Sequence, residues 1–141
     1  MADVAITLAD VRPLPGAIVR RYPAAASGNV GDAIYLASGG VTPADADVDA
    51  SSRVRGIVVA VAGGSKTTYA SGDNVDVVTD GPVTGYASMT RGATLYASVT
   101  TGRIADARPA GASGDFVHVV GFAENANTIY VQPFTDLITA A

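Results

Sequence analysis

The sequence predicts an all-β fold, either a small β-barrel or a β-sandwich. Short apolar runs rich in β-branched and aromatic residues alternate with turn signals at intervals of roughly 8–12 residues, a spacing typical of both architectures. Among the 141 residues are 16 glycines and 7 prolines, which favour turns over long regular elements. The chain has one lysine, Lys66, and one glutamate, Glu124, too few to build the charge pairs of an amphipathic helix.

Length and composition indicate one domain that needs neither disulfides nor metals. A chain of this size buries roughly 68–70% of the surface of its unfolded state, enough for an independent core. Cysteine is absent, which excludes disulfides, thiolate zinc sites and cysteine nucleophiles. The net charge of −4 and the scattered arginines argue against nucleic acid as a partner. Because there is no signal-peptide pattern and no apolar run of ~20 residues, we expect a soluble protein without a membrane partner.

Residues 1–28 are expected to form an extended N-terminal arm or an edge strand. Pro13, Pro15 and Pro23 fix φ and remove backbone donors, which excludes an uninterrupted central strand. A disordered leader is the alternative, but the segment carries a heavier apolar load than a free tail would. We therefore expect the arm to dock, on its own neighbouring structure or on another protein. Its candidate contact residues are Val4, Ile6, Leu8, Val11, Leu14 and Ile18.

Residues 29–141 are expected to form a single β domain. The expected strands are, in order, a short strand within Gly31–Ser38, where Gly31 and Asp32 form the turn that leads into it, and then Arg55–Ala62, Val75–Thr79, Val83–Ala87, Thr94–Ala97, Phe116–Phe122 and Thr128–Val131. The second of these is the most apolar run in the chain and is predicted to be a buried strand. The third and fourth flank Asp80, Gly81 and Pro82, a spacing that predicts a hairpin.

Two parts of this domain, about 29–64 and 90–133, resemble each other. The stretch that begins Gly31-Asp-Ala-Ile-Tyr-Leu-Ala-Ser parallels the one that begins Gly92-Ala-Thr-Leu-Tyr-Ala-Ser. Each is followed by Ala-Asp-Ala and later by Gly-Ile at Gly56 or Gly-Phe at Gly121. We interpret the two parts as related β units packed about a pseudo-two-fold axis, since two copies are too few for a solenoid.

An acidic loop contains the alternating carboxylates of Asp45, Asp47 and Asp49, and carboxylate oxygen is the ligand that calcium prefers. An EF-hand would continue with glycine at its sixth position and an acid at its twelfth, but Ala50 and Gly56 stand there. We therefore expect a solvated acidic loop and no metal. A looser calcium site on the surface is the alternative.

His118 is the only histidine and the only ready general base near neutral pH. Both faces of the strand around it, Phe116 to Val120, are apolar, so we expect His118 to be partly buried or at an interface. No nucleophile motif accompanies it, and we expect no catalytic residue, no cofactor and no enzymatic activity. The candidates for an oligomer interface are Tyr35, Tyr96, His118 and Tyr130.

From about Gly28 to Pro133, the order of these motifs resembles the small capsid cement, or head decoration, proteins of tailed bacteriophages. The resemblance rests on GDAIYLAS, VRGIVVAVAGG, GATLYASVTTGRI and VVGFAENANTIYVQP, in that order. It implies a β-tulip-like barrel that acts as a non-enzymatic virion protein on the outer capsid surface. It further implies a homotrimer that binds across subunits of the major capsid protein, with the arm reaching the shell. Deleting residues 1–15 should then leave a folded trimer that no longer decorates shells.

Three other functions remain open. A base of a head fibre or tail spike would display a host-binding surface, and a long additional domain would favour it. A carbohydrate-binding β module would bind glycans in solution. A small β-barrel hydrolase is disfavoured because the sequence offers neither a nucleophile motif nor a set of metal ligands.

Overall fold

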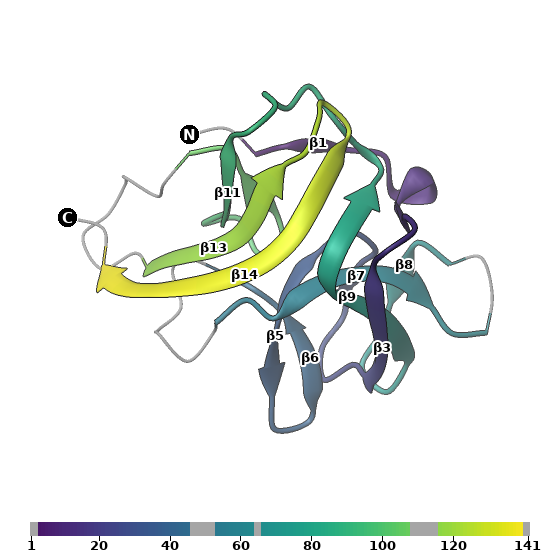
Figure 1. The fold of residues 1–141 in the computed structure, drawn as a ribbon. Helices are drawn as coiled ribbons and strands as arrows, with labels where there is room; N and C mark the ends of the chain where they lie inside the picture. The colour runs from purple at the N-terminus through teal and green to yellow at the C-terminus, as the bar shows by residue number, and fades with distance from the viewer. Residues whose placement is uncertain (1–2, 46–52, 64–65, 108–115, 140–141) are drawn as a thin grey trace.

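The computed structural model describes residues 3–45, 53–63, 66–107 and 116–139. In these ranges the chain is all-β, as the sequence predicts, and most strands belong to one sheet that curls into a half-barrel (Figure 1). One single-turn 3-10 element, η1 (Leu8–Asp10), interrupts the N-terminal strands. No helix in the described ranges is long and apolar enough to cross a membrane.

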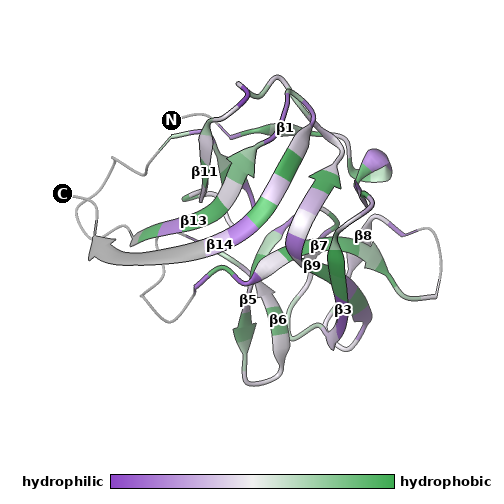
Figure 2. Cartoon of the chain, in the orientation of Figure 1, coloured by the Kyte–Doolittle hydropathy of each residue, from purple (hydrophilic) through white to green (hydrophobic). Residues whose placement is uncertain are grey.

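Most strands are short because glycine and proline punctuate the chain, whereas β9, β13 and β14 are longer. In chain order the strands are β1 (Ala5–Ile6), β2 (Arg12–Pro13), β3 (Ile18–Pro23), β4 (Gly28–Asn29), β5 (Ala33–Ala37), β6 (Gly40–Pro43), β7 (Gly56–Val61), β8 (Thr68–Tyr69), β9 (Asn74–Thr84), β10 (Tyr86–Ala87), β11 (Thr94–Ala97), β12 (Ile104–Ala105), β13 (Phe116–Ala123) and β14 (Thr128–Thr139). Buried and less buried positions alternate along β9 and β11, and polar and apolar colours alternate accordingly in Figure 2.

The main sheet has a palindromic strand order. It runs β12-β11-β13-β14-β9-β7-β5-β6, so β14 and β9 meet at the centre. Outward from the centre, β13 corresponds to β7, β11 to β5 and β12 to β6. The register agrees as well. In the first half Ala33 pairs with Ile57, and in the second half Thr94 pairs with Phe122. The two stretches that resemble each other in sequence thus hold equivalent places in the sheet.

The glycines that the two stretches share have the same structural role in both. Gly31 and Gly92 have φ of 94° and 86°, in the region that favours glycine. A Cβ on Gly56 would collide with the carbonyl oxygen of Val78 in β9, and one on Gly121 would collide with that of Tyr130 in β14. Both glycines therefore permit a close approach between neighbouring strands.

The predicted hairpin around Asp80, Gly81 and Pro82 is wrong, because β9 runs through these residues as one strand. Gly81 has φ of 113°, and a Cβ there would lie 2.6 Å from the Cα of Ala17. The strand changes neighbours at this point: β3 and β7 pair with its first part, and β2 and β14 pair with its second part. The glycine and proline therefore mark a bend inside a strand and not a reversal of the chain.

The N-terminal segment is folded into the body of the protein through short strands, in keeping with the edge-strand alternative. β1 pairs with β10, β2 and β3 pair with β9, and Asp3 bridges to Ala105. Val4 and Val11 are 6% and 7% exposed and belong to the core. The sequence left two docking sites open for this segment, its own neighbouring structure or another protein. In the structure the segment docks on its own chain. Removing residues 1–15 would take two buried side chains out of the core, so this truncation is a poor test of partner binding.

Candidate functional site

The six apolar residues expected to contact a partner divide into three groups. Val4 and Val11 are buried, so the structure withdraws them from any partner surface. Ile6, Leu8 and Leu14 are half-buried against the body. Ile18 is 55% exposed, and its neighbour Val19, which the sequence analysis did not select, is 43% exposed. The accessible apolar part of this segment is therefore β3.

β3 lies at an open edge of the sheet. It pairs with β9 on one side, and in the described part of the chain no strand pairs with the other side of Ile18–Pro23. Directly after the strand, Ala24 forms a parallel bridge to Val41 of β6. Arg20 and Arg21 follow the two exposed apolar residues. The Nε atom of Arg21 lies 2.9 Å from Oδ1 of Asp76, and both side chains are solvent-accessible, so this pair contributes little to stability. An edge of this kind presents unpaired backbone N–H and C=O groups beside an apolar patch.

The predicted oligomer-interface residues differ in accessibility. Tyr35, Tyr96 and Tyr130 are half-buried and keep part of their surface for a partner. His118 is fully buried, so the expectation of a partly buried or interfacial histidine is wrong. The strand is covered on both faces there, since Val117 is buried as well. Burial, and secondarily the positive charge of Arg53, lowers the pKa of His118 and favours the neutral ring.

The predicted acidic loop lies mostly outside the described residues, which include Asp45 but neither Asp47 nor Asp49. Asp45 accepts a hydrogen bond of 2.6 Å from the hydroxyl of Thr101. In the part of the chain that the structure describes, no group of three or more histidine, cysteine or acidic residues could hold a metal ion. The calcium alternative stays a prediction.

Asp32, which the sequence places in a turn, is the only buried acidic residue among those that the structure describes. Asp32 stands between Gly31 and β5 and is 5% exposed. Its Oδ2 atom accepts a hydrogen bond of 2.8 Å from the backbone N–H of Asn29 and a longer one, 3.4 Å, from the hydroxyl of Tyr69. Its Oδ1 atom accepts none from the described residues.

Burial dominates the electrostatics of this carboxyl group. Loss of hydration raises the pKa of Asp32 from 3.8 to about 6, against the opposing effects of the Asn29 and Tyr69 hydrogen bonds and, smallest, the charge of Arg103. Two glycines pack directly on the carboxyl group. A Cβ on Gly28 would lie 2.5 Å from Oδ2, and one on Gly102 would lie 2.7 Å from Oδ1. The backbone thus encloses a carboxyl group whose charged form the fold disfavours.

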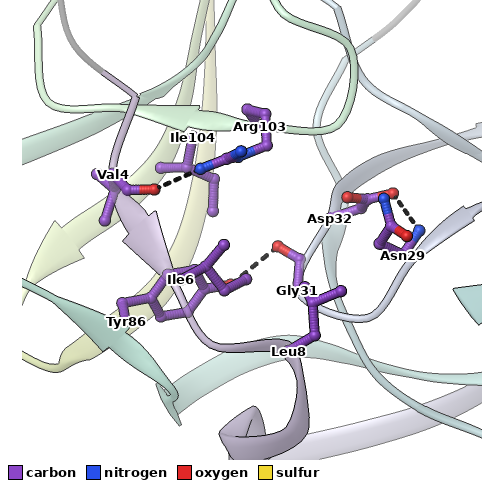
Figure 3. Close-up of a pocket in the computed structure, with 9 residues that line it drawn as sticks. All are labelled: Val4, Ile6, Leu8, Asn29, Gly31, Asp32, Tyr86, Arg103 and Ile104. Atoms are coloured by element: carbon purple, nitrogen blue, oxygen red, sulfur yellow. Dashed lines mark hydrogen bonds between the residues drawn. The ribbon is translucent and has the colours of Figure 1, made fainter. Parts of the chain in front are cut away.

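Asp32 lines a cavity of about 270 Å³ between the N-terminal segment and the body (Figure 3). The aliphatic lining residues are Val4, Ile6, Leu8 and Ile104. The polar lining residues are Asn29, Asp32, Tyr86 and Arg103. Asn29 is exposed, so the cavity meets the surface there. A wider recess of about 500 Å³, lined among others by Tyr69 and Thr101, also reaches Asp32.

Backbone and side-chain hydrogen bonds hold the N-terminal strand, meaning β1 and the adjoining Val4, over this cavity. The guanidinium of Arg103 donates from Nη2 to the carbonyl of Val4 at 2.9 Å, and the N–H of Val4 donates to the carbonyl of Ile104 at 2.7 Å. The buried hydroxyl of Tyr86 donates to the carbonyl of Gly31 at 2.9 Å. In Figure 3 the Arg103 head points toward Val4, which leaves the Asp32 carboxyl group to Asn29.

A second surface feature is a pair of stacked aromatic rings on the sheet. Phe122 of β13 and Tyr130 of β14 are cross-strand neighbours whose ring centroids lie 5.3 Å apart with an interplanar angle of 17°. Phe122 is 36% exposed. It lines a shallow groove of about 410 Å³ together with Thr94, Gln132 and Pro133. The residues that line this groove are uncharged.

Sequence signals for these features were weak for physical reasons. Nothing in the pattern Gly-Asp distinguishes a buried carboxyl group from an ordinary turn residue, because its burial depends on Gly102 and the N-terminal strand, both distant in sequence.

Comparison with known proteins adds no family: no family model matches this sequence, and no curated protein matches it significantly.

Proposed function

We propose that this chain is a non-enzymatic virion structural protein that decorates and stabilises a bacteriophage capsid by binding across subunits of the major capsid protein. The observation that supports this most directly is the open edge of β3, where Ile18 and Val19 are 55% and 43% exposed. An apolar edge strand is a liability for an isolated protein unless a partner covers it. The resemblance of residues 28–133 to head decoration proteins supplies the identity of the partner.

The edge suits attachment by strand addition. A segment of the partner pairing with β3 would gain main-chain hydrogen bonds, and the exposed side chains would set its register. Arg20 is exposed on a chain whose net charge is −4, so the same edge favours a partner strand with an acidic residue. We propose that the protein acts as a homotrimer, because three edges presented together convert weak contacts into durable attachment.

The test is a binding assay with shells assembled from the cognate major capsid protein. The double variant Ile18→Asp with Val19→Asp places charges on the edge without touching a buried residue. We expect its affinity for shells to fall roughly tenfold or more, because burial of each apolar side chain is worth about 1.5–3 kcal/mol. Leu36→Asp is the control, because Leu36 is 45% exposed on β5, a strand that does not pair with β3.

Co-purification of the wild-type chain with intact particles, in a fixed ratio tied to the three-fold positions of the shell, would support the proposal. Light scattering of the free protein should give three copies of the 14.1 kDa chain. Wild-type chain that leaves shells undecorated under all conditions of assembly would refute the function. Undiminished binding of the double variant would refute the role of the β3 edge.

A carbohydrate-binding module is the second candidate, and the Phe122–Tyr130 pair favours it. Aromatic rings on a sheet beside an uncharged groove can stack against a sugar, with Gln132 and Thr94 offering hydrogen bonds. Saturable binding of a neutral oligosaccharide that Phe122→Ala abolishes would establish this function in place of decoration. Absence of binding across a panel of bacterial surface glycans would remove it.

A further inference from the structure

Asp32 is a buried carboxyl group that forms no ion pair with the residues that the structure describes. Among the described residues Arg103 is the positive side chain that acts on it, yet the Arg103 guanidinium is bonded to the carbonyl of Val4. Both hydrogen bonds that Asp32 accepts end on Oδ2. Oδ1 therefore retains its capacity to accept hydrogen bonds.

The repeated unit provides an internal control for the role of this residue. The turn before β5 and the turn before β11 share three main-chain hydrogen bonds, and Asp32 and Ala93 hold the same position in two of them. Both residues donate to the carbonyl three positions earlier, at 3.1 Å and 3.0 Å. Val58 and Ala123 in turn donate to Asp32 and Ala93 at 3.1 Å and 2.9 Å. Because the second turn forms with alanine, the fold does not need a carboxyl group at this place.

The cavity beside Asp32 has the features of a receptacle for a basic side chain. Its aliphatic wall, formed by Val4, Ile6, Leu8 and Ile104, can pack against the methylene stem of a lysine or an arginine. The carboxyl group lies at the polar side of the cavity, and exposed Asn29 marks its opening. A cation that reached Oδ1 would offset the cost of burying the negative charge.

We propose that this cavity receives a lysine or arginine side chain of the protein to which this chain binds, with the stem against the N-terminal strand and the charged head on the carboxylate of Asp32. This inference rests on the proposed function for the identity of the partner, which would be the major capsid protein. The contact adds a charge-specific anchor to the apolar contact at β3. It also fixes the N-terminal strand as one wall of the binding site.

The binding chemistry can be tested on the isolated chain. The probe is N-acetyl-lysine methylamide, and its matched control is N-acetyl-norleucine methylamide, which keeps the aliphatic stem but lacks the ammonium. Binding is followed by the amide NMR signals of Asn29, Asp32 and Ile104. We expect the lysine probe alone to shift these signals saturably. Asp32→Asn should weaken its binding about tenfold or more, the value of one charge-assisted hydrogen bond. Asp10→Asn changes the net charge equally at an exposed site and should leave binding unchanged.

The pH dependence of binding distinguishes a charge contact from a merely structural role. Lysine-probe binding should weaken about tenfold between pH 7.5 and pH 5, because the carboxyl group titrates in this range. Tyr69 and Tyr86 also face Asp32, but burial raises the pKa of both tyrosines, so neither titrates there. Among the described residues, the charged group that faces Asp32 is Arg103. Asp32→Asn should abolish this pH dependence.

Three outcomes with the isolated chain, and one with shells, would overturn the proposal. Equal binding of the norleucine probe would make the cavity purely apolar, and an equal effect of Asp10→Asn would make the attraction non-specific. Saturable binding of spermidine with none of the lysine probe would assign the cavity to a free polyamine. A decoration assay with shells of the major capsid protein distinguishes failure of this inference from failure of the proposed function. If wild-type and Asp32→Asn chains decorate shells equally, the inference fails and the function stands. If the lysine probe binds but shells are never decorated, the function fails alone.

Discussion

Replacing Asp32 by asparagine should stabilise the protein at neutral pH, although it removes a charged residue from a hydrogen-bonded position. Asparagine keeps an oxygen that can accept from the N–H of Asn29, so the 2.8 Å hydrogen bond survives. It has no charge to desolvate. The variant therefore isolates the cost of holding a carboxylate in the interior.

The magnitude follows from the change in pKa on folding. A rise from 3.8 to about 6, at 1.36 kcal/mol per pKa unit, corresponds to about 3 kcal/mol. Between these two values the folded chain binds the proton and the unfolded chain does not, so the contribution of Asp32 to stability falls as pH rises. The cost is about 0.5 kcal/mol at pH 4 and about 3 kcal/mol from pH 7 upward. Since Asp32 is 5% exposed, solvent screening reduces this little.

Urea unfolding of the wild type and Asp32→Asn at pH 7.5 and pH 4 provides the assay. Every other carboxyl group is common to both proteins, so the difference in unfolding free energy reports position 32. We expect the variant to be more stable by about 2–3 kcal/mol at pH 7.5, with most of this gain lost at pH 4. A variant that is less stable than the wild type at pH 7.5, or a difference that does not change with pH, would refute the reasoning.

Three further predictions concern the packing around Asp32 and of the N-terminal segment, and each is measured by urea unfolding at pH 7.5. Gly102→Ala should lower the free energy of unfolding by more than 2 kcal/mol, because it combines a φ of 79° with a clash against the buried carboxyl group. Its control is Gly92→Ala, which has a φ of 86° but open space around it and should cost about 1 kcal/mol. Equal losses of stability would show that the close approach of Gly102 to Asp32 is unimportant. Val11→Ala should lower the free energy of unfolding by about 2 kcal/mol, because Val11 is buried in the core. Ile18→Ala should lower it by less than about 0.5 kcal/mol, because Ile18 is exposed. The reverse order of the two losses would contradict this packing of the N-terminal segment. Tyr86→Phe should cost about 1–3 kcal/mol because it leaves a buried carbonyl without its donor, and a neutral effect would mean that water replaces the hydroxyl.

The sequence predicted the fold class because local chemistry carries that information. Thr94–Ala97 and Thr128–Val131 are strands, as expected from their β-branched and aromatic residues, and β14 extends further along the chain than predicted. The similarity between the Gly31 and Gly92 stretches also has a structural counterpart, since its glycines are required by backbone geometry in both places.

Prediction failed where one local signal has two structural meanings. Glycine and proline at 81 and 82 are typical of a turn, but a sheet that must bend within a strand needs the same residues. The prolines at the N-terminus are compatible with an extended arm and with an edge strand, and β2 and β3 form edge strands that pair with β9. Asp32 was missed because its environment is assembled from three parts of the chain that are remote in sequence.

The two halves of the sheet are equivalent, but the N-terminal segment covers the turn of only one of them, and the cavity lies in that half. At Gly31 the N-terminal segment covers the turn, and a Cβ there would collide with Ile6 and lie 3.4 Å from Val11. At Gly92 no atom lies within 4 Å of the same position. The equivalent residue in the open half is Ala93, and the buried carboxyl group stands in the covered half. Of these two equivalent turns, the buried charge therefore stands beside the one that the N-terminal segment covers, where the cavity gives the proposed cationic side chain access to it.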